Sequence, residues 1–336
     1  CADLNQTATC TVEVVDQKHS FDDNIMISIF WPPTPAYITD EQYKLLADAG
    51  VNWVMGAGEE TLATVENQAK MLELCAKYGM GLTVSDGSFG RSLQGKTAAQ
   101  VASIVSRYKN VPGAYGFYIL DEPFNPNDYL NAYINLKKAA PDAYMHLNFL
   151  PSGAYGSEEI YKAQMNDWAR LTAAAGYPLD YLMFDRYPFP LQAGAMDRAG
   201  FFRNTRACYE VGLKNDVKTG MYIQTVCQEV AFRRPTDSEI RYQMYASLAF
   251  GYKQLSFFTW FTPESQNESF VDGIMTTDGK PNQHYAYIKE INREILAIGK
   301  TLAKCDVLSV YFDGAESPLY EQPSIPAGFF VQVAEG

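Results

Sequence analysis

The sequence is poor in the residues that build metal and redox sites. It has only three histidines, His19, His146 and His284, and none of them forms an H-x-H or H-E-x-x-H motif. Its six cysteines include no C-x-x-C pair, which excludes zinc ribbons and thioredoxin-like redox motifs. We therefore expect no metal and no other cofactor, and we interpret His146 as a satisfied barrel residue rather than a catalyst.

Positive charge and long apolar runs are also scarce. Lys and Arg number 27 against 39 Asp and Glu, which gives a net charge of −12 with no basic stripe. Because phosphate binding requires clustered Lys and Arg, the sequence argues against a nucleic acid partner. No apolar run approaches the roughly 20 residues that a membrane helix needs.

Core-forming residues, by contrast, are abundant. Hydrophobic residues make up 47% of the 336 positions, enough for one large domain or two of ordinary size. Aromatic residues reach 14%, including 23 Tyr. Most of them would fill a large core. Some could line a sugar site, because flat rings stack on the apolar faces of pyranoses.

The most informative stretch is residues 114–123, AYGFYILDEP. Residues 115–120 have the character of a strand that is covered on both faces, as in a parallel sheet. The strand runs directly into Asp121, Glu122 and a proline. In α/β barrels the C-terminal ends of the strands carry the chemistry, so we place Glu122 at the centre of the predicted site.

Strands and amphipathic helices alternate from residue 21 to residue 305. Threonines at 39, 97 and 236, each followed three residues later by Gln or Glu, mark three helix starts. The expected strands are 24–30, 51–55, 81–85, 115–120, 144–150, 181–184, 219–224 and 255–260. Eight strand–helix units predict an α/β fold of the (β/α)8 TIM-barrel type rather than a doubly wound sheet.

Both ends of the chain depart from this pattern. Residues 1–20 look like a polar tether, and a Cys1 followed by such a tether resembles the processed end of a bacterial lipoprotein. The alternative is a chain that merely begins at a cysteine. Residues 306–336 form a short β-rich extension with β-like stretches at 307–312 and 329–333, which either edge the barrel or begin a further sheet domain.

The predicted strand ends bring together a set of side chains without a phosphate loop or a metal cluster. They are Trp31, Asp86, Asp121, Glu122, Asn148, Asp185, Tyr187, Gln224 and Trp260. Carboxylates and amides accept hydrogen bonds from hydroxyl groups, and tryptophan stacks on sugar faces. The set therefore suits a neutral, hydroxyl-rich ligand such as an oligosaccharide or polysaccharide.

Paired carboxylates across a sugar pocket are what glycosidic cleavage needs. We assign Glu122 as the general acid, because the charge of Asp121 beside it would help to keep it protonated. The competing interpretation is that Asp121 and Glu122 only cap the helix that follows. We assign Asn148, Tyr187 and Gln224 to substrate positioning, or otherwise to hydrogen bonding at the barrel mouth without a ligand.

The remaining mouth residues have two interpretations each. Trp31 and Trp260 are sugar platforms, or lids of the core. Asp86 and Asp121 accept hydrogen bonds from substrate hydroxyls, in line with the other polar groups of the mouth.

The stretch GFYILDEP resembles the fourth-strand motif of clan A glycoside hydrolases, in which a strand ends in Asn-Glu-Pro and the Glu is the acid/base. The segments WPPTPAYITDEQYKLLADAGVNWV, LSFFTWF and DGKPNQHYAYIKEINREI are similar to barrel hydrolases of the family 42 β-galactosidase type. The likeness covers about residues 24–305. It implies a TIM-barrel glycosidase without a cofactor.

Two positions depart from the pattern of that clan. Asp121 stands where the clan usually has Asn, and the seventh strand ends in Gln224 where the clan has its Glu nucleophile. The second carboxylate could be Asp185, on a neighbouring strand end, or Glu229, in the loop beyond Gln224. The plain alternatives are an ion pair of Asp185 with Arg186 or another arginine of the mouth, and a solvated loop position for Glu229 near Arg233 and Arg234.

We therefore expect an exported glycoside hydrolase, held at the cell envelope by a lipid on Cys1, that cleaves an O-glycosidic bond with two carboxylates. The competing hypothesis is a carbohydrate-binding barrel without turnover, which the missing strand-seven Glu favours. An aldolase or lyase is a weaker third possibility, because Lys218 lies at the start of its strand rather than at the mouth.

Overall fold

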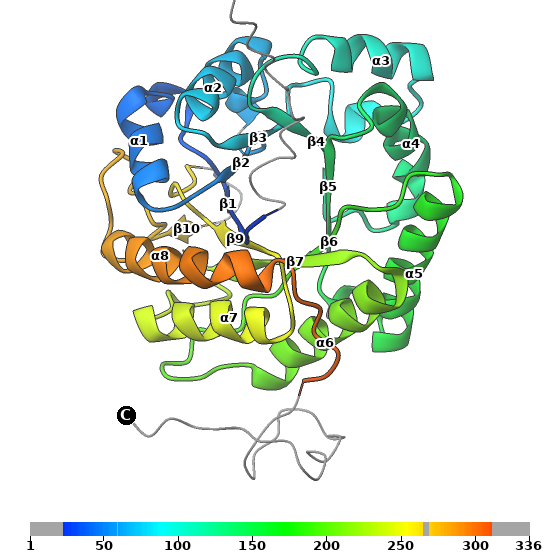
Figure 1. Cartoon of the computed structure of the whole chain (residues 1–336). Helices are drawn as coiled ribbons and strands as arrows, with labels where there is room; N and C mark the ends of the chain where they lie inside the picture. The colour runs from blue at the N-terminus through cyan, green and yellow to red at the C-terminus, as the bar shows by residue number, and fades with distance from the viewer. Residues whose placement is uncertain (1–22, 59, 265–268, 311–336) are drawn as a thin grey trace, which may run out of the picture.

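The computed structural model describes residues 23–58, 60–264 and 269–310. In these residues, parallel strands close into a barrel in the order β1-β2-β3-β4-β5-β6-β7-β9, and helices form a ring outside it (Figure 1). The (β/α)8 fold is therefore confirmed. The short strands β8 (Cys227–Gln228) and β10 (Phe270–Val271) pair antiparallel as a separate ribbon.

The elements follow the expected ranges closely. The barrel strands are β1 (Met26–Phe30), β2 (Trp53–Met55), β3 (Gly81–Val84), β4 (Ala114–Asp121), β5 (Tyr144–Phe149), β6 (Tyr181–Asp185), β7 (Lys218–Gln224) and β9 (Gln254–Phe258). The helices are α1 (Asp40–Asp48), α2 (Val65–Lys77), α3 (Ala98–Ser106), α4 (Leu130–Ala139), α5 (Glu158–Ala174), α6 (Arg198–Asn215), α7 (Asp237–Ala249) and α8 (Tyr285–Leu302).

The three threonine caps that the sequence predicts are all present. Thr97 before α3 and Thr236 before α7 each complete a reciprocal capping box with the residue three positions on. Thr39 accepts a hydrogen bond from the Gln42 backbone N–H, but the Gln42 side chain donates to the Gly279 carbonyl instead. The first cap therefore has only one of the two hydrogen bonds of a capping box. The Gln42 side chain instead connects α1 to the loop before α8.

The inside of the barrel is packed with large side chains. Trp53 is fully buried, and its indole N–H donates to the Thr83 hydroxyl at 2.8 Å. Gly81 and Gly116 leave the space for its ring: a Cβ on Gly81 would lie 2.5 Å from the ring, and one on Gly116 would lie 2.9 Å from it. The two glycines on β3 and β4 are therefore the reason that β2 can carry a tryptophan inward.

A chain of neutral polar groups crosses the barrel above that layer. Tyr144 and Tyr222 place their hydroxyls 2.8 Å and 3.1 Å from the two ring nitrogens of His146. The Tyr144 hydroxyl also donates to Gln254, whose amide donates to Ser28. Burial lowers the pKa of His146 to about 3, so the ring is neutral and the interior carries no charge there. The interpretation of His146 as a satisfied barrel residue agrees with these bonds.

The ends of the described chain add two corrections. The last barrel strand ends at Phe258, two residues before the expected Trp260. Residues 307–310 form no strand, so the β-like stretch expected at 307–312 is wrong over its described part. The tether at 1–20 and the stretch at 329–333 lie outside the described residues. No described helix combines the length and apolar character needed to cross a bilayer.

We predict that Gly81→Ala destabilises the protein by about 1–3 kcal/mol, because the added methyl group overpacks the barrel against Trp53. Urea unfolding followed by tryptophan fluorescence measures the change. Gly153→Ala is the control and should shift the midpoint little, since no atom lies within 4 Å of the position that its methyl group would take. Equal midpoints for the two variants would contradict this account of the barrel interior.

Candidate functional site

The ends of β4, β5 and β6 bring three of the predicted site residues together. The Asn148 side-chain amide donates one hydrogen bond to the Asp121 carboxylate and one to the Asp185 carboxyl group, each at 3.1 Å. Asp121 and Asn148 are register partners on adjacent strands, so the pleat points both side chains to the same face. Asn148 thus bridges two acids that the chain separates by 64 positions.

Glu122 completes the cluster by contacting Asp185. The two carboxyl groups share a hydrogen bond, which requires that one of them carries a proton. Asp185 is only 6% exposed, and its burial is the main reason that its pKa lies well above the ordinary value. The negative charges of Glu122 and Asp121 raise it further. Asp185 is therefore the member of the cluster on which burial most favours the protonated form.

The backbone at Glu122 adopts an uncommon conformation. Its φ is 51°, in the left-handed region that costs a non-glycine residue on the order of 1 kcal/mol or more. A 3.0 Å hydrogen bond from the Glu122 N–H to the Asn148 carbonyl holds it there. One residue earlier, the Asp121 N–H donates to the Tyr118 hydroxyl at 2.7 Å. The strand end is therefore fixed while the Glu122 side chain remains exposed.

Two of the predicted aromatic residues lie directly beyond strand ends, Tyr187 after β6 and Trp31 after β1. Tyr187 is half-buried and stacks on Phe258 at a centroid distance of 5.0 Å. Burial and then the charges of Asp185 and Asp121 raise its pKa, so the hydroxyl stays protonated. Trp31 is half-buried, and its ring meets Phe30 edge-on at 6.0 Å. Each side chain is thus partly open to solvent, and its contact with substrate stays a prediction.

The Gln224 side chain is hydrogen-bonded to the backbone of two neighbouring loops. Its side chain is fully buried, accepts from the Phe189 N–H at 3.1 Å and donates to the Arg233 carbonyl at 2.7 Å. Its backbone bonds to the Gln243 side chain through both its N–H and its C=O. These bonds tie together the loops after β6 and β7. We therefore interpret Gln224 as a brace of the mouth rather than a group that touches substrate.

Two further predicted contacts lie away from the acids. Asp86 is 3% exposed and is bonded to Tyr108, to the Ser88 N–H and to Arg107, which leaves it as an anchor between β3 and α3. Trp260 is fully buried, and its ring packs against Tyr285 of α8 at 5.9 Å. It follows the end of β9 and faces the helix layer, so it offers no ring face to a ligand.

The two alternatives for the second carboxylate now separate. Asp185 contacts Glu122, whereas Arg186, its expected ion-pair partner, pairs with Asp197 instead. Glu229 is exposed beyond β8, and its backbone N–H bonds to the Ser269 carbonyl. The structure thus joins Asp185 to the acid pair and leaves Glu229 on the β8–β10 ribbon.

Several residues that were not predicted from the sequence support the site residues. Tyr118 fixes the end of β4, and Phe258 and Phe232 support Tyr187. The spacing of Tyr118 and Asp121 carries a usable signal, because a strand bulge near position 119 lets the tyrosine reach forward to the Asp121 N–H. No local pattern marks Phe232, which comes from a distant loop.

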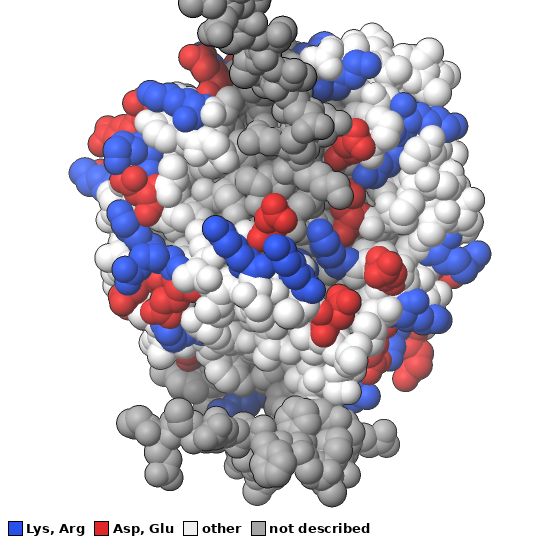
Figure 2. All heavy atoms as spheres, in the orientation of Figure 1, with Lys and Arg blue, Asp and Glu red and all other residues white. Residues whose placement is uncertain are grey.

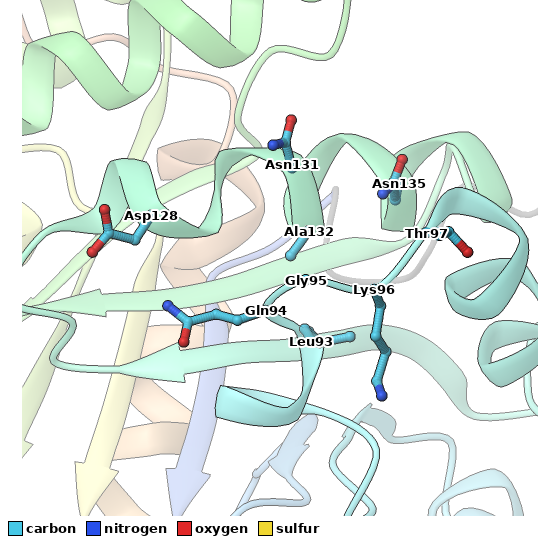
Figure 3. Close-up of a pocket in the computed structure, with 9 residues that line it drawn as sticks. All are labelled: Leu93, Gln94, Gly95, Lys96, Thr97, Asp128, Asn131, Ala132 and Asn135. Atoms are coloured by element: carbon cyan, nitrogen blue, oxygen red, sulfur yellow. The ribbon is translucent and has the colours of Figure 1, made fainter.

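Other concave and charged features do not compete with this cluster. A pocket of about 330 Å³ lies between residues 93–97 and the start of α4, and its lining shares no residue with the acids (Figure 3). The described part of the face in Figure 2 shows Lys and Arg interspersed with Asp and Glu. Among the described residues, no group of His, Cys, Asp and Glu has the arrangement of a metal site.

Comparison with known proteins gives one family. The model of glycoside hydrolase family 42, described as beta-galactosidase, matches residues 125–298, just over half of the chain. The matched segment includes Asn148, Asp185 and Gln224 and begins three residues after Glu122. Among curated protein sequences, none matches this chain.

Several solved structures share the fold. A beta-galactosidase from Marinomonas ef1 has a TM-score of 0.61 at 11% identity over 83% of this chain and 62% of its own. A beta-galactosidase from Halorubrum lacusprofundi has a TM-score of 0.58 at 13% identity over 81% and 58%. The Faecalibacterium prausnitzii beta-glucuronidase has a TM-score of 0.56 at 12% identity over 81% and 49%. This chain therefore spans only part of these relatives, and the likeness shows the fold alone.

We predict that Asp185→Asn stabilises the protein at neutral pH by about 0.5–2 kcal/mol, because it removes a buried carboxyl group that faces other acids. The pKa of Asp185 is raised on folding, so the folded protein binds more protons than the unfolded chain between the unfolded value, about 3.9, and the folded one. The parent loses stability as pH rises through that interval, whereas the variant does not.

Thermal unfolding from pH 3 to pH 8 measures this difference. The advantage of Asp185→Asn should be present at pH 7 and should shrink towards pH 3, where both states of the parent are protonated. A variant that is less stable than the parent at every pH would show instead that the carboxyl group stabilises the fold.

We predict that Gln224→Glu destabilises the protein by about 1–3 kcal/mol, because a carboxylate cannot donate to the Arg233 carbonyl and would be buried there. The loss should be larger at pH 8 than at pH 4, where the new acid is more easily protonated. Gln228→Glu makes the same chemical change at a half-buried position of β8 and should cost less than about 0.5 kcal/mol. A Gln224→Glu variant as stable as the parent would contradict the bracing role.

Proposed function

This chain belongs to glycoside hydrolase family 42, and on that premise we propose that it hydrolyses an O-glycosidic bond at the C-terminal end of its barrel, with Glu122 as the general acid. The observation that carries the proposal is the contact between the exposed Glu122 and Asp185, a buried carboxyl group whose raised pKa favours keeping its proton. Glycosidic cleavage starts with such a proton, because the leaving oxygen must be protonated as its bond to the anomeric carbon breaks.

The two members of the pair differ in what they can reach. Asp185 is buried and accepts a hydrogen bond from Asn148, so its carboxyl group is held in place at the strand end. Glu122 is exposed and stands on a fixed backbone, so its side chain can turn to a bound sugar. Glu122 therefore delivers the shared proton to the leaving oxygen, and Asp185 stores it between turnovers.

Asp185 is also the second carboxylate of the proposal. After the proton has gone to the leaving group, Asp185 is an anion that can attack the anomeric carbon or activate water. The two carboxyl groups are hydrogen-bonded to each other here, whereas retaining enzymes hold theirs about 5 Å apart and inverting ones about 6.5–9.5 Å apart. A bound sugar must therefore part them, and the exposed Glu122 side chain is the one that moves.

The surrounding groups suit a sugar hydroxyl pattern. Asp121 accepts hydrogen bonds, the protonated Tyr187 donates them, and Trp31 offers part of a ring face. Asp86, Gln224 and Trp260 do not take part, since each is occupied elsewhere in the scaffold. The substrate class of the proposal is an oligosaccharide or polysaccharide, with β-galactosides as the first choice from the family description.

Gln224 supports a second candidate function, carbohydrate binding without turnover. Gln224 ends β7, at the position where the resemblance to clan A places the nucleophile, and it is locked into the scaffold. A carbohydrate-binding barrel without turnover would keep the sugar contacts and need no such nucleophile. Product analysis separates the two functions: a glycan that binds and is recovered intact supports the binding protein.

We predict that Glu122→Gln lowers kcat/KM by about 10²- to 10⁴-fold for disaccharides with poor leaving groups, because the variant lacks the proton donor. The loss should be much smaller for 4-nitrophenyl glycosides, whose leaving group needs little protonation. The assay compares disaccharides and 4-nitrophenyl compounds of β-galactose and β-glucuronic acid.

Glu229→Gln is the matched control, because it makes the same exchange at the other predicted acid and should leave kcat/KM unchanged. Equal losses of Glu122→Gln on both leaving groups would contradict the acid role. No hydrolysis of any compound by the parent would favour the binding protein.

A further inference from the structure

Phe124 is a solvent-exposed aromatic side chain close in sequence to Glu122 of the acid pair. It is 73% exposed, which is unusual for so large an apolar group, and it lies two residues beyond Glu122. Pro123 between them is buried, so the short connection from the end of β4 is anchored. The ring therefore stands on the same fixed loop start that carries the proposed acid.

Two tyrosines support the Phe124 ring from behind. The centroid of Tyr155 lies 6.4 Å from that of Phe124 with planes 31° apart, and Tyr155 is only 7% exposed. Tyr155 in turn stacks on the fully buried Tyr161 at 5.4 Å and 29°. This column of rings runs from the core to the surface, and its outermost face is open.

The column stands within electrostatic reach of the acid pair. Burial and then the charges of Glu122 and Asp185 raise the pKa of Tyr155 to about 12. Tyr155 thus interacts with the acid pair and also packs against Phe124, which follows Glu122 by two residues. The column thus joins the acid pair to a flat, apolar surface.

We propose that Phe124 is a stacking platform for the ring that departs with the glycosidic oxygen, either the leaving sugar or an aromatic aglycone. The assignment rests on the proposed function, in which Glu122 protonates that oxygen. A group that leaves from the Glu122 side must pass over the loop that follows Glu122, and Phe124 is the flat side chain there. Neither the resemblance nor the family match assigns this residue, which precedes the matched segment by one position.

Other exposed apolar residues near the strand ends lack the required shape. Val230 is 78% exposed and Leu191 is 49% exposed, but neither has a flat face. Tyr242 is 41% exposed and carries a ring, yet it lies on α7 with its ring edge-on to Phe202. Tyr242 therefore serves as a control for the loss of an exposed ring elsewhere.

The test measures binding without turnover. In a Glu122→Gln background, the dissociation constants of phenyl β-D-galactopyranoside and methyl β-D-galactopyranoside are determined by calorimetry, and the corresponding β-D-glucuronides are measured in parallel. The phenyl compound should bind more tightly in at least one pair. Phe124→Ala and Phe124→Leu should each lower that preference about three- to tenfold, whereas Phe124→Tyr and Tyr242→Ala should preserve it.

The leucine variant separates stacking from apolar contact, since it retains an exposed apolar side chain without a flat face. An unchanged preference in Phe124→Ala, a Phe124→Leu variant equal to the background, or no preference for the phenyl compound in either pair would overturn the platform. The binding readout does not depend on hydrolysis. A preference that depends on Phe124 in a protein without turnover would therefore keep the platform and reject the hydrolase.

Discussion

Two carboxyl groups in hydrogen-bond contact are the constraint on which this site depends. Ionised carboxylates repel one another at that distance, so the contact between Glu122 and Asp185 persists only while it holds a proton. Asn148 makes the arrangement tolerable, because its amide donates to Asp185 and to Asp121 and so offsets part of the negative charge. The protonation state of the cluster therefore depends on how deeply Asp185 is buried.

Two arginines in the loops beyond the strand ends pair with acids outside this cluster. Arg186 directly follows Asp185 in the chain but turns to Asp197, and Arg233 makes two hydrogen bonds to Glu239 at 2.6 and 2.8 Å. The interior beneath the acids contains His146, which burial keeps neutral. A cation in contact with Asp185 would favour its ionised form and release the proton. The pairing of these arginines elsewhere thus maintains the protonated state on which the proposed chemistry relies.

Much of the fold followed from the sequence, because the relevant signals are local. Threonine caps at positions 97 and 236 and the alternation of apolar strands with amphipathic helices are properties of short segments. The predicted end of the last strand is wrong, because residue 260 is as apolar as the strand before it. Burial alone cannot distinguish a strand from the core loop that continues it.

The site was only partly predictable. Strand ends located Asp121, Glu122, Asn148 and Asp185 correctly at one mouth, since parallel strands point the same way. The sequence could not show that the Gln224 side chain would be hydrogen-bonded to a backbone N–H and a backbone carbonyl of distant loops. Those partners depend on how the loops fold back over the strand end. It also could not show which acid would hold the proton. That property comes from burial, and Asp185 is the buried one.

The most direct test of the central claim is a ¹³C NMR titration of the side-chain carboxyl carbons, with Asp185 assigned by the Asp185→Asn variant. The account predicts that Asp185 titrates well above the ordinary value of about 4. Its pKa should fall in Glu122→Gln, since the charge beside it is gone, yet stay above the ordinary value because burial remains. A carboxyl group at position 185 that titrates near 4 and ignores the Glu122→Gln change would contradict the shared proton.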